Sequence, residues 1–148
     1  LRPPLVYGPG CKGNYIRLAR FAKKSPFIPK VNNQRSMIYI DNLSEFVRWI
    51  ISFNASGLYF PQNSNYVNTT EALSLIANSN GKQRTILNYV SIPIHILSIF
   101  LPVFRKVFGS CTYDMKMPGG PKSFNDGFSY ETCSFSDSIM YSEKGYNI

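Results

Sequence analysis

Residues 1–14 read LRPPLVYGPGCKGN, and this stretch decides how the 148-residue chain is interpreted. Gly8, Gly10 and Gly13 match the G-x-G-x-x-G motif, whose glycines let backbone N–H groups approach a dinucleotide pyrophosphate at a helix N-terminus. That motif also requires an acidic residue about twenty positions further on. Here no Asp or Glu precedes Asp41, and the proline inside the loop has no N–H to offer. We therefore interpret the glycines as turn residues between a strand and a helix.

An amphipathic helix is predicted directly after this turn, over residues 15–24. Asn14 is a favourable N-cap residue, and Ser25-Pro26 would end the helix. One predicted face is apolar and another is basic. The apolar face consists of Tyr15, Leu18, Ala19 and Ala22, and the basic face of Arg17, Arg20 and Lys24. A strand, a glycine turn and a basic helix together suit an anion bound at the helix N-terminus.

The positive charge of the chain is concentrated in its first quarter. The sequence has 16 Lys and Arg against 8 Asp and Glu, a formal net charge of +8. Residues 1–40 hold half of the basic residues and no acidic one, so the remainder is neutral. Three interpretations stay open: a solvated basic helix face, a pocket for a phosphate-bearing small molecule, and a nucleic-acid surface.

Residues 1–15 together with QRSMIYIDNL at 34–43 resemble the extended short-chain dehydrogenase/reductase family. More narrowly, they resemble the NAD-dependent epimerase/dehydratases that act on nucleotide sugars. In that family an R-P-x-x-V-Y-G-P strand follows the catalytic helix, and an arginine-led strand segment follows later. The resemblance implies an α/β fold, in which residues 1–12 form the last strands of a Rossmann sheet. Residues 13–148 would form the nucleotide-sugar-binding lobe, with short strands and several helices.

The catalytic pair of that family, Tyr-x-x-x-Lys, is missing from the sequence. No tyrosine has a lysine four positions on, and Tyr113 and Tyr141 have one at three. The chain also begins at Leu1 rather than at a methionine. We therefore expect the C-terminal half of a longer, UDP-sugar 4-epimerase-like enzyme of surface-polysaccharide biosynthesis. NAD would be bound mainly by the missing half, and the isolated chain would be inactive.

Carried over position by position, the resemblance implies five site residues. Pro3 and Pro4 would border the nicotinamide, and Leu5 would lie near the sugar, where many relatives have a polar residue. Asn14 would cap the helix whose start faces the substrate diphosphate. Arg35 would clamp that diphosphate, because a planar guanidinium makes charge-assisted bonds to phosphate oxygens. Arg35 and the helix start should then share one cavity.

Simpler alternatives stay open for both polar residues. Arg35 could be a surface arginine paired with Asp41 or Glu45, and Asn14 could cap the helix and do nothing else. For the chain as a whole, the alternatives are a basic nucleic-acid-binding module and an inactive fragment. We expect a nucleotide-sugar partner, a homodimeric full-length enzyme and no nucleic acid.

The rest of the chain predicts further short strands and helices. We expect strands at 37–40, 57–60 and 82–87, a helix capped by Asp41 or Asn42, and a helix capped by Asn68. A last strand and short helix are expected over 130–143. In the second helix, an apolar face predicts core packing, and it consists of Leu43, Phe46, Val47, Ile50 and Phe53. Trp49, beside this face, is expected to pack rather than to stack on a ligand.

Residues 85–104 carry no charge, a length that would permit a membrane span. Pro93, His95 and other polar residues dilute its hydrophobicity, and Pro93 suits the first turn of a helix. We therefore expect a helix over residues 93–108 that packs on the lobe and has a face for a partner or membrane surface, with His95 as a core residue. A true membrane span is the alternative. The three cysteines have no metal-ligand spacing, and His95 is the only histidine. The sequence therefore predicts no metal site and a reducing, cytoplasmic location.

Overall fold

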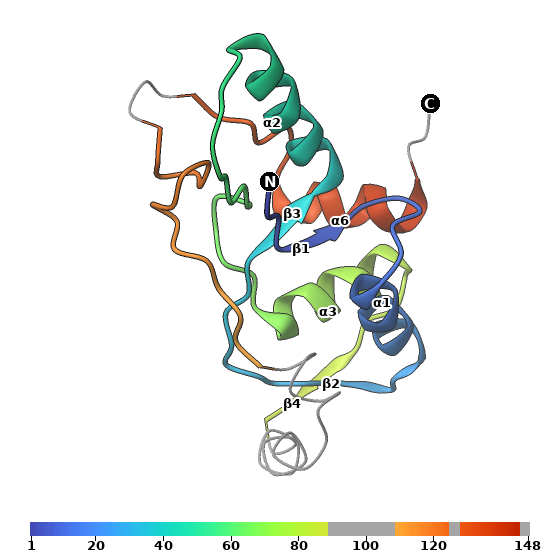
Figure 1. The fold of residues 1–148 in the computed structure, drawn as a ribbon. Coiled ribbons are helices and arrows are strands. Elements are labelled where there is room, and N and C mark those ends of the chain that lie inside the picture. The colour runs from blue at the N-terminus through green and yellow to red at the C-terminus, as the bar shows by residue number, and fades with distance from the viewer. Residues whose placement is uncertain (89–108, 125–127, 146–148) are drawn as a thin grey trace.

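The computed structural model describes residues 1–88, 109–124 and 128–145, which form a mixed α/β arrangement (Figure 1). Strand β1 (Leu5–Tyr7) pairs in parallel with β3 (Met37–Tyr39), and β2 (Phe27–Pro29) pairs in parallel with β4 (Thr85–Leu87). The described helices are α1 (Asn14–Lys24), α2 (Ile40–Ser52), α3 (Thr69–Ser79) and α6 (Phe135–Lys144). Parallel strands need a long crossover connection, and α1 lies in the connection from β1 towards β3.

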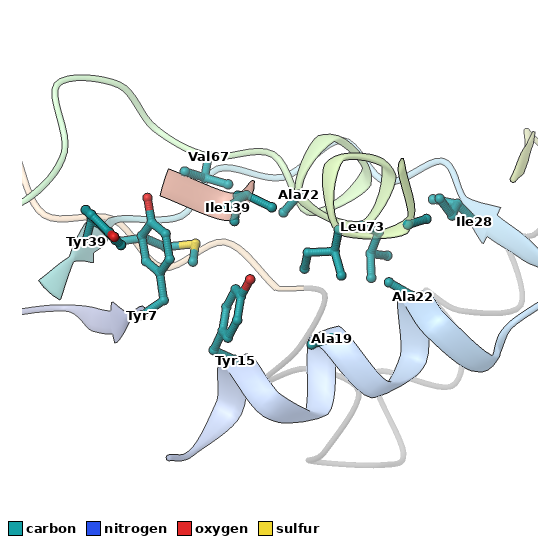
Figure 2. Close-up of a cluster of buried hydrophobic side chains, with 13 residues drawn as sticks. Tyr7, Tyr15, Ala19, Ala22, Ile28, Tyr39, Val67, Ala72, Leu73 and Ile139 are labelled. Carbon is teal, nitrogen blue, oxygen red and sulfur yellow. The ribbon is translucent and has the colours of Figure 1, made fainter. Parts of the chain in front are cut away.

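The main core lies between α1, α3, α6 and the β1–β3 pair (Figure 2). Helix α1 contributes the apolar face predicted from the sequence, since Tyr15, Ala19 and Ala22 are buried there. Leu73 and Ile76 of α3 and Ile139 of α6 are fully buried in the same cluster. Tyr15 is only 4% exposed and its hydroxyl donates to Glu143 Oε1 at 2.9 Å, so this ring is not available to stack on a nucleic-acid base.

A second, aromatic cluster holds α2 in place. Phe46 is fully buried, and its ring lies 5.1 Å from that of Tyr130 and 5.9 Å from that of Trp49. Trp49 also stacks on Phe128, which confirms that it packs within the protein. The prediction for Phe53 was wrong, because α2 ends at Ser52 and the Phe53 side chain is 70% exposed.

The predicted helix caps divide into one that is confirmed and two that are wrong. Asn68 caps α3, where its side-chain oxygen accepts from the backbone N–H groups of Thr70 and Glu71. Asn14 is the first residue of α1, and the N-cap position belongs to Gly13 without a side-chain cap bond. Asn42 lies inside α2, which begins directly after β3 with Tyr39 as its N-cap.

Two predicted strands are absent from the described residues. Residues 57–60 are held by single backbone bonds, from Arg2 N to Tyr59 O at 2.9 Å and from Phe60 N to Pro118 O at 2.8 Å, rather than by a ladder. Residues 130–134 likewise form no strand before α6. The prediction of a helix over 93–108, and that for His95, lie outside the described residues. Within the described part, no helix combines the length and the apolar character that a membrane crossing needs.

A chain of buried side-chain hydrogen bonds connects these layers. The backbone N–H and the hydroxyl of Thr132 both donate to Asn42 Oδ1 at 2.8 Å, and Asn42 Nδ2 donates to Asn63 Oδ1 at 3.1 Å. Asn63 Nδ2 donates to the Tyr7 hydroxyl at 3.0 Å, which lies 2.7 Å from Ser138 Oγ. These hydrogen bonds link α2, β1 and α6. They explain why the Asn42 side chain is directed into the interior rather than used as a helix cap.

Candidate functional site

The five residues singled out in the sequence line one surface cavity of about 450 Å³. Pro3, Pro4 and Leu5 come from the start of the chain and β1, Asn14 begins α1, and Arg35 precedes β3. The other lining residues are Val6, Lys12, Ser36, Cys111 and Tyr113. The volume lies within the range of small-molecule sites. Two of the ten lining side chains are cationic and none is acidic, so the cavity favours an anion.

Backbone pairing on both sides fixes the position of Arg35. Its N–H donates to Val67 O at 3.0 Å, and its carbonyl accepts from Val67 N at 2.9 Å. On the other side, Cys111 N donates to Gln34 O at 3.0 Å, and Ser36 N donates to Cys111 O at 2.9 Å. Arg35 therefore lies between two extended segments that come from distant parts of the chain.

The Arg35 guanidinium is half-buried at the cavity wall. Burial lowers its pKa from the ordinary value, yet an arginine remains cationic at neutral pH. Its Nη1 donates to Gly109 O at 3.4 Å, a long and weak bond. Glu45, one of the two acids that could have paired with Arg35, forms an ion pair with Arg48 at 2.5 Å.

The start of α1 adds further positive potential to the same cavity. The N-cap Gly13 has φ +107, a left-handed conformation that favours glycine, and provides no side chain to satisfy the first-turn N–H groups. The first turn contains no acidic residue, and Lys12 lies just before it. The N-terminal end of a helix carries a partial positive charge. Arg35, Lys12 and the α1 start thus contribute the same sign of potential.

A smaller apolar recess of about 20 Å³ adjoins this cavity and shares Leu5, Asn14 and Arg35 with it. Leu18, Met37, Val67, Thr69 and Ala72 complete its lining. Leu5 therefore presents an apolar surface beside the cationic groups. The recess itself is only large enough for about one water molecule, so the apolar surface that it offers a ligand is that at its mouth.

Sequence reasoning missed four polar or reactive residues of the cavity. Lys12 carried a usable signal, because it lies between the strand and the helix in the acid-free quarter of the chain. Ser36, Cys111 and Tyr113 carried none. Ser36 Oγ accepts from Tyr113 N at 2.8 Å, a bond across 77 positions of sequence that no local pattern reveals.

The loop that contains Gly8, Gly10 and Gly13 does not have the form of a backbone cradle for the pyrophosphate of NAD. A Cβ on Gly8 would lie 2.4 Å from Ile40 Cγ2, so this glycine permits close packing of the loop against α2. Cys11 N donates to Gly8 O at 3.2 Å and closes a turn. Pro3 and Pro4, which were expected to border the nicotinamide, line the cavity around Arg35 and contribute apolar surface to it.

A second cavity, of about 630 Å³, lies beside α6 and the start of α3. Its lining includes the carboxylates of Glu71 and Glu131 and no cationic side chain. A diphosphate would be repelled there, so the cavity around Arg35 is the better anion site of the two.

The chain is similar to known proteins in sequence and in fold. The chain is similar to UDP-glucose 4-epimerase of Vibrio cholerae, with 30% identity over 111 residues, 72% of this chain. That match covers 33% of the relative, so the chain spans about a third of its length. A solved structure of a Burkholderia cenocepacia J2315 protein, assigned as an epimerase, shares the fold with a TM-score of 0.54 at 12% identity. The structural match covers 97% of this chain and 44% of the chain of the Burkholderia protein. No protein-family model matches the sequence. The sequence similarity supports an epimerase-like relationship for the chain, and the structural similarity shows the fold alone.

Proposed function

We propose that the chain is the nucleotide-sugar-binding part of an NAD-dependent epimerase, of the kind that inverts C4 of a UDP-sugar for surface-polysaccharide synthesis. The proposal depends mainly on one observation: Arg35 and the start of α1 share a cavity that no acidic side chain lines. The similarity to a UDP-glucose 4-epimerase supports the same class of substrate. In the proposed full-length enzyme, residues 1–12 complete a Rossmann sheet and residues 13–148 form the substrate lobe.

The chemistry of the cavity suits the diphosphate of such a substrate. The planar guanidinium of Arg35 can donate two parallel bonds to phosphate oxygens, and the first-turn N–H groups of α1 can donate others. Hydrogen bonds to a charged group contribute about 1.5–3 kcal/mol each. Lys12 adds long-range attraction from the cavity rim. The apolar surface of Leu5 and its recess would then contact the less polar part of the ligand.

In this proposal the chain binds and orients the substrate but does not perform the chemistry. The described residues do not form an NAD cradle, and the sequence has no Tyr-x-x-x-Lys pair. The acid–base and redox groups must therefore come from other residues of the full-length enzyme. We also propose that this enzyme is a cytoplasmic homodimer, and that the isolated chain binds nucleotide without turning over a UDP-sugar.

Calorimetric titration of the chain with uridine diphosphate tests the proposal. Arg35→Ala removes a pair of charge-assisted bonds and should weaken binding about 100-fold, since about 3 kcal/mol is lost. The matched control is Arg48→Ala, which removes an exposed arginine paired with Glu45 on α2. Uridine monophosphate should bind more weakly than the diphosphate. Equal affinity of the Arg35→Ala variant and the parent chain would contradict the proposal.

A further inference from the structure

Helix α1 has a basic outer face that the proposed nucleotide site does not use. Arg17, Arg20, Phe21 and Lys24 lie on the side of α1 opposite its buried residues, and all four are exposed. We refer to these four residues as the basic face of α1. Their spacing of three, four and seven positions brings their side chains together over two helical turns. The face lies outside the cavity around Arg35, because none of its residues lines that cavity.

The charge of this face is not neutralised by the ion pairs found among the described residues. Those pairs join Lys23 to Glu143 and Arg48 to Glu45. Lys23 therefore forms an ion pair with α6. Arg17, Arg20 and Lys24 belong to neither of the two ion pairs. The three side chains lie within eight positions of one helix, so their fields add at a facing surface.

Other cations near α1 have a structural role and are kept apart from this face. Lys82 Nζ and Arg84 Nη2 both donate to Lys23 O, at 2.8 and 3.1 Å, and so satisfy the C-terminal end of α1. Cations at that end also complement the helix dipole. This explanation does not extend to Arg17, which belongs to the first turns of the helix, where a positive charge is unfavourable. The helix dipole therefore gives no reason for a cation at Arg17.

An aromatic residue among the cations indicates the kind of partner. Phe21, on the same face as Arg17 and Lys24, is 37% exposed. A helix side that combines cations with an exposed phenylalanine suits the headgroup region of an anionic bilayer. A single-stranded nucleic acid would be expected to use a groove with several stacking rings. The basic face of α1 offers one ring, that of Phe21.

We propose that the basic face of α1 binds the surface of an anionic phospholipid membrane and so makes the protein a peripheral membrane protein. Arg17, Arg20 and Lys24 approach the lipid phosphates, and Phe21 enters the headgroup layer. The binding is electrostatic and reversible, and it leaves the cavity around Arg35 open to solvent. It is independent of the proposed nucleotide binding.

Co-sedimentation of the 148-residue chain with vesicles tests this proposal. The probe is phosphatidylcholine vesicles with and without phosphatidylserine, at low and high salt. Near an anionic surface each cation contributes about fivefold to binding, so replacing Arg17, Arg20 and Lys24 by Gln should lower the partition coefficient about 100-fold. Binding of the parent chain should require phosphatidylserine and weaken as salt shortens the Debye length. Phe21→Ser should lower binding less, and its effect should persist at high salt.

A matched control separates this face from net charge. Replacing Lys116, Lys122 and Lys144 by Gln also removes three positive charges, from exposed positions outside α1. This variant should bind vesicles like the parent. Circular dichroism should show that both triple variants are folded. Equal loss in the two variants would overturn the proposal, as would a parent chain that ignores phosphatidylserine. Tighter binding to a single-stranded oligonucleotide than to vesicles, lost in the Arg17, Arg20 and Lys24 variant, would assign the face to nucleic acid instead.

Discussion

Tyr7→Phe is expected to destabilise the protein by removing one hydroxyl at the centre of the buried hydrogen-bond chain. Ser138 Oγ donates to Phe135 O at 2.7 Å, so the Tyr7 hydroxyl must be the donor in its 2.7 Å bond to Ser138 Oγ. The same hydroxyl accepts from Asn63 Nδ2 at 3.0 Å. The substitution leaves the ring and its packing in place and removes both bonds.

The cost follows from the burial of the two partners. Asn63 is 5% exposed and Ser138 is 1% exposed, so water does not readily replace the lost hydroxyl. A buried polar group left without its partner costs about 1–3 kcal/mol. For a chain of this size, a loss of about 2 kcal/mol corresponds to a fall in Tm of roughly 4–8 °C. Tyr59→Phe is the control, because the Tyr59 hydroxyl makes one exposed bond, to Ser56 O at 3.0 Å.

The pH dependence of stability gives a sharper test of the same hydroxyl. Burial raises the pKa of Tyr7 to about 12, above its ordinary value of 10.0. The unfolded chain therefore loses this proton first, and the folded state loses stability as pH rises from about 10 to about 12. Burial also raises the pKa of Tyr130 to about 12. Because Tyr130 is present both in the parent chain and in Tyr7→Phe, its titration does not contribute to the difference between their curves.

Urea denaturation between pH 8 and pH 11 should therefore show a steeper alkaline loss of unfolding free energy in the parent chain than in Tyr7→Phe. The two curves should converge as pH rises, because the parent loses an advantage that the variant lacks. Parallel curves, or a variant as stable as the parent at neutral pH, would refute this account of the Tyr7 hydroxyl.

Three further substitutions test the fold. Gly8→Ala should lower Tm in a thermal melt, because the added Cβ would lie 2.4 Å from Ile40 Cγ2 and such overpacking costs about 1–3 kcal/mol. Asn68→Ala should lower the urea unfolding free energy by about 0.5–2 kcal/mol, since its side chain caps α3. Glu143→Gln should cost about 1–2 kcal/mol, less at high salt, because its 3% exposed side chain lies 2.6 Å from the partly exposed Lys23 Nζ.

Each of these substitutions has a matched control at a less constrained position. Gly10→Ala adds a Cβ that meets nothing within 4 Å, so only the strain of φ +71 remains. Asn78→Ala changes an exposed asparagine on the same helix as the cap, and Glu45→Gln changes an exposed ion pair. Losses in the controls as large as those in the test variants would show that the specific contacts do not determine stability.

The elements predicted correctly are those that local periodicity specifies. The apolar spacing of Tyr15, Ala19 and Ala22 identified the buried face of α1, because the same residues must face the core whatever packs against them. The cap at Asn68 was equally local, since the backbone N–H groups that donate to its side-chain oxygen lie two and three positions away. Local signals of this kind need no knowledge of the rest of the fold.

The failed cap prediction at Asn42 has a different cause, which is competition from a distant partner. Asn42 had the spacing of a helix cap, but Thr132, 90 positions away, binds its side-chain oxygen inside the protein. In the candidate site, Arg35 and Asn14 could be selected from the sequence. Cys111 and Tyr113 could not, because the bond from Tyr113 N to Ser36 Oγ that places this segment has no local signature.

An NMR titration of the amide-labelled chain with uridine diphosphate tests the central claim most directly. If the diphosphate is bound between Arg35 and the start of α1, the amide resonances of Asn14, Tyr15 and Arg35 should shift together, and uridine alone should shift them much less. Shifts confined to the second cavity, around Glu71 and Glu131, or the same shifts with uridine alone, would contradict the account.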